Sequence, residues 1–174
     1  MSKTTDAVIQ TTGTMIKKLS LETAWSKNML SLLRRSIASG EEDPEVLGWL
    51  FTEIPEGISG KNGQMSYAEK AIYLALCIYA NTRKGNGEDR TIIQAMKAIG
   101  MDRTNLVQVE LSESLEDMRM PLYMLTQHIV SKGGVFSYTL LAKDLYLFQF
   151  DKMQVIRKWE REFTREENEC KRKT

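Results

Sequence analysis

The stretch SYAEKAIYLALCIYA, residues 66–80, decides the fold, because a helix over these positions has almost no polar side. A helix that is apolar nearly all round must be enclosed by neighbouring helices. Ser66 and Glu69 have the spacing of a capping box, in which each side chain pairs with the other residue's backbone amide. At about fifteen residues the segment is too short to span a bilayer. The sequence therefore predicts the central helix of a soluble helical bundle.

The composition of the whole chain is typical of a globular protein and favours helices. Its 174 residues suit one domain or two small ones, and 42% of them are hydrophobic and 27% charged. No alternating run of Val, Ile and Thr is long enough to indicate a sheet. The predicted fold class is therefore all-α.

Start and stop signals divide the rest of the chain into further helices. Asp43 and Pro44 are typical of a helix start, and Asp151 has the place of an N-cap before the last helix. Pro121 lies inside a helical pattern, so a kink or a break is expected there. Residues 103–111 could be helix or another structure. The expected helices cover residues 4–19, 22–39, 43–54, 66–80, 89–99, 114–131, 137–148 and 151–163.

A domain boundary is expected near Gly100, which closes a short helix after the central one. The segment that follows Gly100 is less regular. We therefore predict two small helical bundle subdomains, residues 1–100 and 101–174. The charged end of the second, from about residue 165, is expected to fray.

The final helix has the most informative surface in the chain. Rotation by about 100° per residue gives it an apolar face and an opposite, basic face, with Glu160 and Glu162 at the flanks. A solvated face usually alternates charge sign, which favours i,i+4 pairs. Repulsion within a basic face is relieved by an anionic partner or by salt. The apolar face has Val155, Ile156, Trp159 and Phe163, and the basic face has Gln154, Arg157, Lys158, Arg161 and Arg165.

Other cations could extend this basic face into a binding surface for a polyanion such as a nucleic acid. The chain has 24 basic and 23 acidic residues, a net charge of only +1, so a basic surface must arise by segregation of charge. Arginine is favoured where phosphate is held bidentately. The alternative for each single cation is a solvated charge or a structural ion pair. The further candidates are Lys27, Arg34, Arg35, Arg83, Lys84 and Lys152.

Enzymatic chemistry has little support in the sequence. The single histidine, His128, lies among apolar residues, where histidine is usually packed in the core. Because there is no second histidine, the sequence has no His-rich metal site and little basis for a Ser-His-Asp arrangement. The GKNG turn lacks the frame of a phosphate-binding loop. The three tryptophans stand at helical spacing beside aliphatic residues and are assigned to packing. We therefore expect no catalytic residue, no metal and no cofactor.

The two cysteines and the chain start indicate where the protein resides. Cys77 lies inside the apolar helix and Cys170 in the charged tail, so a buried thiol and an incidental thiol are expected rather than a disulfide. The start MSKTTDAVIQ lacks the apolar region of a signal peptide, and no segment could span a membrane. A cytoplasmic location without membrane contact is expected.

Four stretches form an ordered set along the chain: AWSKNMLSLLRRSI (24–37), the acidic Pro-containing helix after it, ALCIYA (75–80) and GGVFSYTLLAKDLYLFQFDKMQVIRKWEREF (133–163). In this order they resemble the CasB family, the small subunit of the type I-E CRISPR Cascade complex. The best marks are the pair Arg34 and Arg35, Asp144 before Leu145, and Trp159 followed by Arg161 and Phe163. The likeness covers most of the chain.

The resemblance implies an all-helical, two-subdomain protein without enzymatic activity. It also implies partners: a second copy of the chain, guide RNA, target DNA and the larger Cas subunits of a ribonucleoprotein. Basic surfaces of the small subunits in that family hold the displaced strand and the RNA-guided duplex. The positions that match on this chain are Arg34, Arg35, Lys152, Arg157, Lys158 and Arg161.

Our first hypothesis is a non-catalytic nucleic-acid-binding scaffold that holds backbone without reading sequence, in antiviral defence. The alternative is a helical interaction or regulatory module whose basic face binds an acidic protein partner. That alternative predicts no response to single-stranded DNA even at low salt. A third possibility, a hydrolase with paired carboxylates and a metal, predicts that a divalent ion raises the melting temperature.

Overall fold

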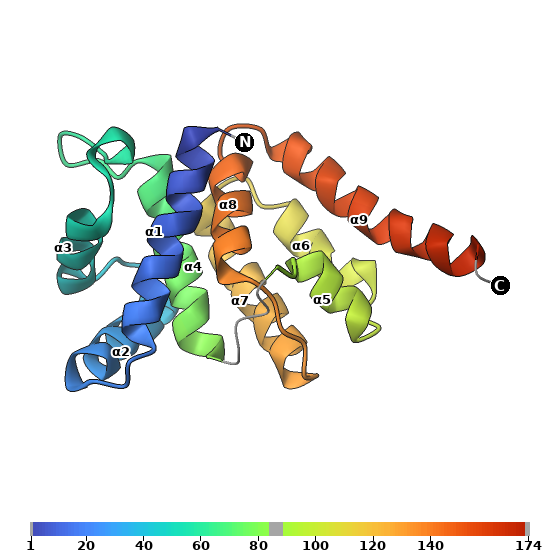
Figure 1. Ribbon diagram of the computed structural model, residues 1–174, viewed down its shortest axis with the longest axis horizontal. Coiled ribbons are helices and arrows are strands. Elements are labelled where there is room, and N and C mark those ends of the chain that lie inside the picture. The colour runs from blue at the N-terminus through green and yellow to red at the C-terminus, as the bar shows by residue number, and fades with distance from the viewer. Residues whose placement is uncertain (1, 84–88, 173–174) are drawn as a thin grey trace.

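The computed structural model describes residues 2–83 and 89–172, with side chains described up to residue 165 (Figure 1). The described residues contain helices and no β-strand, which confirms the all-α class. Two short 3-10 segments, Glu56–Ile58 and Arg103–Leu106, lie between helices. The helices are α1 Lys3–Leu19, α2 Ala24–Ser39, α3 Pro44–Glu53, α4 Tyr67–Thr82, α5 Ile92–Ala98, α6 Val107–Glu110, α7 Leu115–Ser131, α8 Tyr138–Phe148 and α9 Lys152–Arg172.

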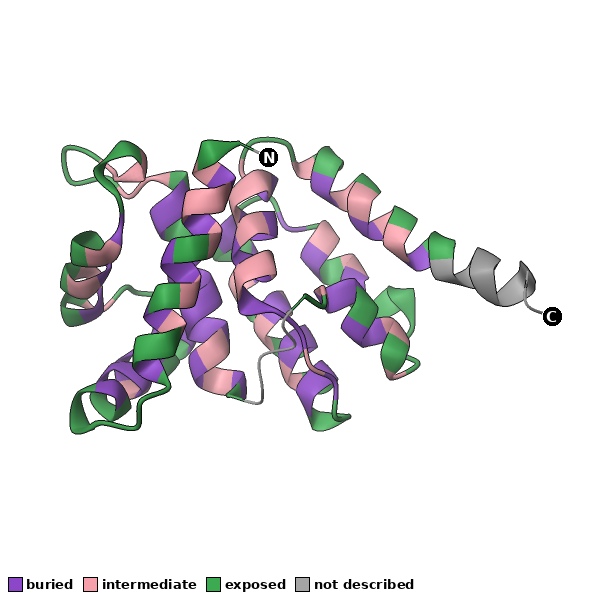
Figure 2. Ribbon diagram, viewed as in Figure 1, coloured by how far each residue is buried: buried purple, intermediate pink, exposed green. Residues whose placement is uncertain are grey.

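Helix α4 is the centre of the bundle, as its apolar sequence predicts. Ile72, Leu76 and Ile78 are fully buried, and α1, α2, α7 and α8 pack around the helix (Figures 1 and 2). The capping box is present, with the Glu69 amide donating to Ser66 Oγ and the Ser66 amide donating to the Glu69 carboxylate. That carboxylate also accepts from the Gly60 amide, so the cap fixes the preceding loop as well.

The hydrophobic core joins helices from both halves of the chain. Helix α8 packs against α1 and α4, and α7 packs against α4. Helix α9 lies outside this group, on α8 and α5, and extends away from the bundle (Figure 1). The division into two subdomains at residue 100 stays a prediction, because shared packing does not decide whether either half folds alone.

Most helix ends agree with the signals in the sequence. Asp43 accepts from the amides of Glu45 and Val46 at the start of α3, and Asp151 accepts from the Gln154 amide at the start of α9. Residues 103–111 form a 3-10 segment that continues into the single turn of α6. None of the helices in the described part of the chain combines the length and the hydropathy that crossing a membrane requires.

A kink or a break was expected at Pro121. The break does not occur, since α7 runs without interruption through this residue, and the kink stays a prediction. Proline removes one backbone hydrogen bond and crowds the preceding turn. Met118 and Leu122, on either side of Pro121, are fully buried in the core. Burial of each such side chain contributes about 1.5–3 kcal/mol. Packing of α7 on the bundle therefore keeps the helix continuous.

Candidate nucleic-acid interface

The apolar face of α9 attaches this helix to the bundle. Val155, Trp159 and Phe163 recur every four residues and are buried, and Trp159 is 1% exposed. The Trp159 ring lies 6.4 Å from the Phe148 ring of α8, centroid to centroid, in a stacked arrangement. The same rotation that buries these three residues turns positions 157 and 161 away from the bundle. The amphipathic prediction for this helix is confirmed.

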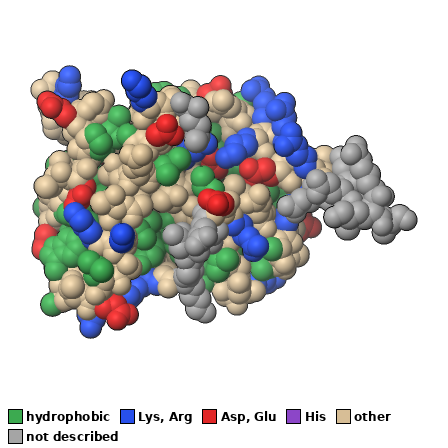
Figure 3. Space-filling model, viewed as in Figure 1, with side chains coloured by type: hydrophobic (Ala, Val, Ile, Leu, Met, Phe, Trp, Pro, Cys, Tyr) green, Lys and Arg blue, Asp and Glu red, His purple; other side chains and the backbone are tan. Residues whose placement is uncertain are grey.

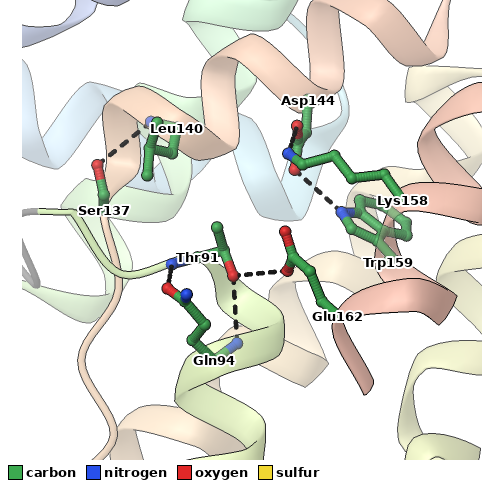
Figure 4. A network of polar contacts seen from close by, with 8 residues as sticks. All are labelled: Thr91, Gln94, Ser137, Leu140, Asp144, Lys158, Trp159 and Glu162. Carbon is green, nitrogen blue, oxygen red and sulfur yellow. Dashed lines mark hydrogen bonds and ion pairs between the residues drawn. The ribbon is translucent and has the colours of Figure 1, made fainter. Parts of the chain in front are cut away.

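Lys158 is held by the fold rather than directed freely into solvent. Its Nζ lies 2.7 Å from Oδ1 of Asp144, a residue of α8 that is only 2% exposed. The Trp159 indole N–H donates to Oδ2 of the same carboxylate at 2.9 Å (Figure 4). The loss of hydration of a buried carboxylate has to be offset by an opposite charge and by hydrogen bonds, which Lys158 and Trp159 supply here. For Lys158 the structure supports the alternative of a structural ion pair.

The two acidic residues at the flanks of α9 face the protein body. Both carboxylate oxygens of Glu160 accept from Arg103 Nε, at 2.8 and 2.6 Å. Glu162 accepts at 2.8 Å from the Thr91 hydroxyl, which also caps α5 together with Gln94 (Figure 4). These carboxylates therefore have partners on other elements.

Three arginines remain on the outer side of α9, and we name Arg157, Arg161 and Arg165 the α9 arginine face. All three side chains are exposed. Among the described residues none of them takes part in an ion pair or a side-chain hydrogen bond. Lys and Arg side chains gather along α9 at the upper right of the surface view (Figure 3). The three arginines recur every four residues, so they lie on one side of the helix.

Lys152, at the start of α9, has a weak ion pair and an aromatic contact. Its Nζ lies 3.6 Å from Glu113 Oε1, and Glu113 is largely exposed. The same Nζ lies 5.8 Å from the centroid of the Phe148 ring. An exposed ion pair of this kind contributes about 0–1 kcal/mol, so a phosphate could replace Glu113 at little cost.

A second group of predicted cations meets at the carboxyl end of α4. Arg34 Nη1 lies 3.4 Å from the Ala80 carbonyl oxygen, and Arg83 caps the helix in a left-handed conformation with φ of 41°. The negative end of a helix dipole favours cations. The structure thus joins two residues that are 49 positions apart. Lys84, predicted beside them, lies outside the described residues.

The remaining candidates on α2 do not join the α9 arginine face. Lys27 and Arg35 are exposed. Among the described residues neither takes part in an ion pair. Helix α2 lies at the lower left of the bundle and α9 at the right, with α7 and α8 between them (Figure 1). A ligand that reached both groups would have to cross the bundle.

Core packing was predicted for His128 and Trp25 from their apolar neighbours in the sequence, and both predictions need correction. Neighbours in the sequence do not determine whether a side chain faces the core or the solvent. The His128 side chain is exposed rather than packed in the core. Trp25 is 41% exposed, and its ring meets the Trp49 ring edge-on with 4.9 Å between the centroids, so it is only partly a packing residue.

Cys77 is a buried thiol as expected, and burial raises its pKa. The described residues include no group of three or more His, Cys, Asp and Glu side chains that could hold a metal ion.

Glu110 and Glu160 form an acidic pair where α6 meets α9. Burial raises the pKa of Glu110 to about 7, and the hydrogen bond to Glu160 and the charge of that neighbour add to the rise. Burial would also raise the pKa of Glu160, but hydrogen bonds from Arg103 and Glu110 lower it overall. The two carboxyl groups therefore share a proton near neutral pH.

We expect Glu110 to make the protein less stable as the pH rises from about 5 to 8. Its carboxyl binds a proton more tightly in the folded chain than in the unfolded chain, where the pKa is near the usual 4.5. Stability is therefore lost as the pH rises through 7. With allowance for solvent screening, the loss is about 1–2 kcal/mol.

Urea unfolding at pH 5 and pH 8 measures this effect in the wild type and in Glu110→Gln. The variant keeps a neutral side chain at both pH values. Its free energy of unfolding should therefore fall less between pH 5 and pH 8 than that of the wild type. An equal decrease in both proteins would show that Glu110 does not titrate in this range.

Comparison with known proteins gives the family. The family model described as CRISPR-associated protein Cse2 matches residues 29–163. The structure is similar to the crystal structure of CasB from Thermobifida fusca, with a TM-score of 0.69 at 18% identity, over 94% of this chain and 98% of that chain. No curated protein sequence matches the chain. Since the family match extends from α2 to α9, the chain belongs to the Cse2 (CasB) family of Cascade small subunits, which the resemblance of its sequence predicts.

Proposed function

We propose that the protein is a non-catalytic scaffold within an RNA-guided surveillance complex of type I-E, where its basic helical surfaces hold nucleic-acid backbone. The observation that carries this proposal is the α9 arginine face. Its arginines are exposed, whereas Glu160 and Glu162 on the same helix are engaged by Arg103 and Thr91. A cationic face whose neighbouring acids are turned inward favours a polyanion.

The proposed contact is independent of sequence. Arginine side chains on the outer side of a helix can reach phosphates, whereas base pairing with the guide supplies specificity. Lys152, Arg34 and Arg83 provide further phosphate contacts at the start of α9 and at the end of α4. If four such contacts form with a single strand, the logarithm of affinity should fall with the logarithm of salt concentration at a slope of about −3.

The partners in this proposal are the guide RNA, the target DNA as displaced strand and RNA-paired duplex, the larger Cas subunits and a second copy of the chain. The complex would act in antiviral defence in the cytoplasm. The competing proposal is a module whose α9 arginine face binds an acidic protein. Both proposals place the ligand on the same arginines, so the identity of the bound molecule distinguishes them.

Purification of the tagged protein from its native host at moderate salt tests the proposal. We expect one discrete RNA species and several larger proteins to accompany it in a fixed ratio. If the protein emerges alone, or with one protein and no nucleic acid, the scaffold proposal is wrong. A single acidic partner in that sample would support the interaction module instead.

A further inference from the structure

An exposed aromatic cluster lies where α4, α8 and α9 meet. We name Tyr67, Tyr146 and Phe150 the Phe150 cluster. The Phe150 ring is 4.9 Å from the Tyr67 ring and 4.8 Å from the Tyr146 ring, centroid to centroid, edge-on in both cases. Phe150 is 58% exposed and Tyr67 46%. Large aromatic side chains that remain this exposed mark an interaction surface.

The backbone beneath the cluster is fixed, so the rings are already positioned in the free protein. The side chain of Gln149 donates to the Tyr67 carbonyl oxygen at 2.8 Å and to the Leu145 carbonyl oxygen at 3.2 Å. These bonds join the α8–α9 connection to the first residue of α4. A rigid platform loses little conformational entropy when a ligand binds.

Two lysines and one aspartate border the cluster, and the aspartate, Asp151, accepts from the Gln154 amide at the start of α9. Lys70 Nζ lies 6.0 Å from the Tyr67 ring centroid, and Lys152 follows Phe150 by two positions. Met153, which is 48% exposed, stands four residues before Arg157 and eight before Arg161. Residues at this spacing share one face of a helix, and this row spans about 12 Å. This row begins three residues after Phe150, where α9 leaves the cluster.

The other exposed aromatic surface, on α2 and α3, has different electrostatics. It includes Trp25, Trp49 and Phe51, which is 48% exposed. The Trp49 indole N–H donates to the Glu53 carboxylate at 3.2 Å, and Lys18 pairs with the same carboxylate. The Trp49 indole is therefore already engaged by an ion pair, whereas a lysine ammonium lies near the Tyr67 ring of the Phe150 cluster. This difference favours the Phe150 cluster as the surface suited to nucleic acid.

We propose that the Phe150 cluster is a base-stacking site for the single strand held by the α9 arginine face. This inference rests on the proposed function and adds a contact to bases, because arginines alone would hold only backbone. Proteins that bind single strands combine a basic track with aromatic side chains on which bases stack. Every base has a π-face, so the contact stays independent of sequence. Phe150, the most exposed ring, carries most of the stacking.

The test uses the full chain and two fluorescent oligonucleotides, an oligo-dT and the same backbone with abasic sites. Fluorescence anisotropy at low salt measures the affinity of the wild type, Phe150→Ala and the matched control Phe51→Ala. For oligo-dT we expect Phe150→Ala to lose about 5- to 100-fold in affinity, with an unchanged salt slope. The control should bind as the wild type does. On the abasic strand all three proteins should bind alike.

Each outcome has a defined meaning. If the wild type binds neither oligonucleotide, the proposed function fails and the stacking site fails with it. If the wild type binds but Phe150→Ala binds oligo-dT equally well, only the stacking site is overturned. Loss of co-purifying Cas subunits from Phe150→Ala, with unchanged strand affinity, would assign the cluster to a protein partner instead. Phe150→Leu keeps apolar volume without a π-face, so its affinity should be reduced as well.

Discussion

Replacement of Arg157 and Arg161 by glutamate should abolish binding to single-stranded DNA while the protein melts at nearly the same temperature. Both side chains are exposed and turned away from the core. Neither takes part in an ion pair with another described residue, so the substitution removes no structural contact. Two lost phosphate contacts reduce the salt slope by about 1.4, and the new carboxylates repel the strand. Anisotropy titrations and thermal unfolding give the two results.

The matched control places the same charge change elsewhere. Lys17→Glu with Lys61→Glu alters two exposed lysines that are not on α9, one on α1 and one in the loop before α4. If net charge alone determined binding, both double variants would fail equally. A loss of several kcal/mol in the stability of the arginine variant, on the order that broken buried contacts produce, would identify these arginines as structural residues.

Asp144→Ala should lower the free energy of unfolding by about 2–4 kcal/mol. The Asp144 carboxylate is 2% exposed and receives both the Lys158 ammonium and the Trp159 indole N–H. Without it, the indole N–H stays buried without a partner and α9 loses its anchor to α8. Urea unfolding at neutral pH measures the change. A loss below about 1 kcal/mol would mean that water replaces the carboxylate.

A double-mutant cycle with Lys158→Met separates the two roles of Lys158. If the ion pair is structural, the double variant should be more stable than the sum of the single effects predicts, by about 0.5–3 kcal/mol. Lys158→Met should also leave the salt slope of strand binding unchanged. A slope reduced by about 0.7 would instead assign a phosphate contact to Lys158.

The sequence was sufficient wherever the signal is local. Residues 66–80 have almost no polar side, so a central place for α4 was predictable, and Ser66 and Glu69 mark its start within one turn. Val155, Trp159 and Phe163 recur every four residues, so the buried face of α9 and its opposite were also predictable. These features depend on helical periodicity and capping, which involve residues within about four positions of each other.

Helical periodicity did not predict which charged side chains pair with residues on other helices. Lys158 belongs to the basic face of α9 by rotation, yet its partner Asp144 comes from the preceding helix. Glu160 pairs with Arg103, which is 57 positions away. Arg34 reaches the end of α4 that Arg83 caps only because α2 packs on α4. Exposure of His128 likewise depends on which side of α7 the bundle leaves open to solvent.

The sequence alone therefore determined the all-α class, the central helix, the two faces of α9 and, through ordered motifs, the family. The tertiary structure decided which cations on α9 remain unpaired among the described residues, and it brought Tyr67 beside Phe150. The physical reason is the distance along the chain over which each kind of interaction acts. Helix periodicity is set by neighbours along the chain, whereas ion pairs and ring contacts depend on the packing of elements far apart in sequence, which propensity does not encode.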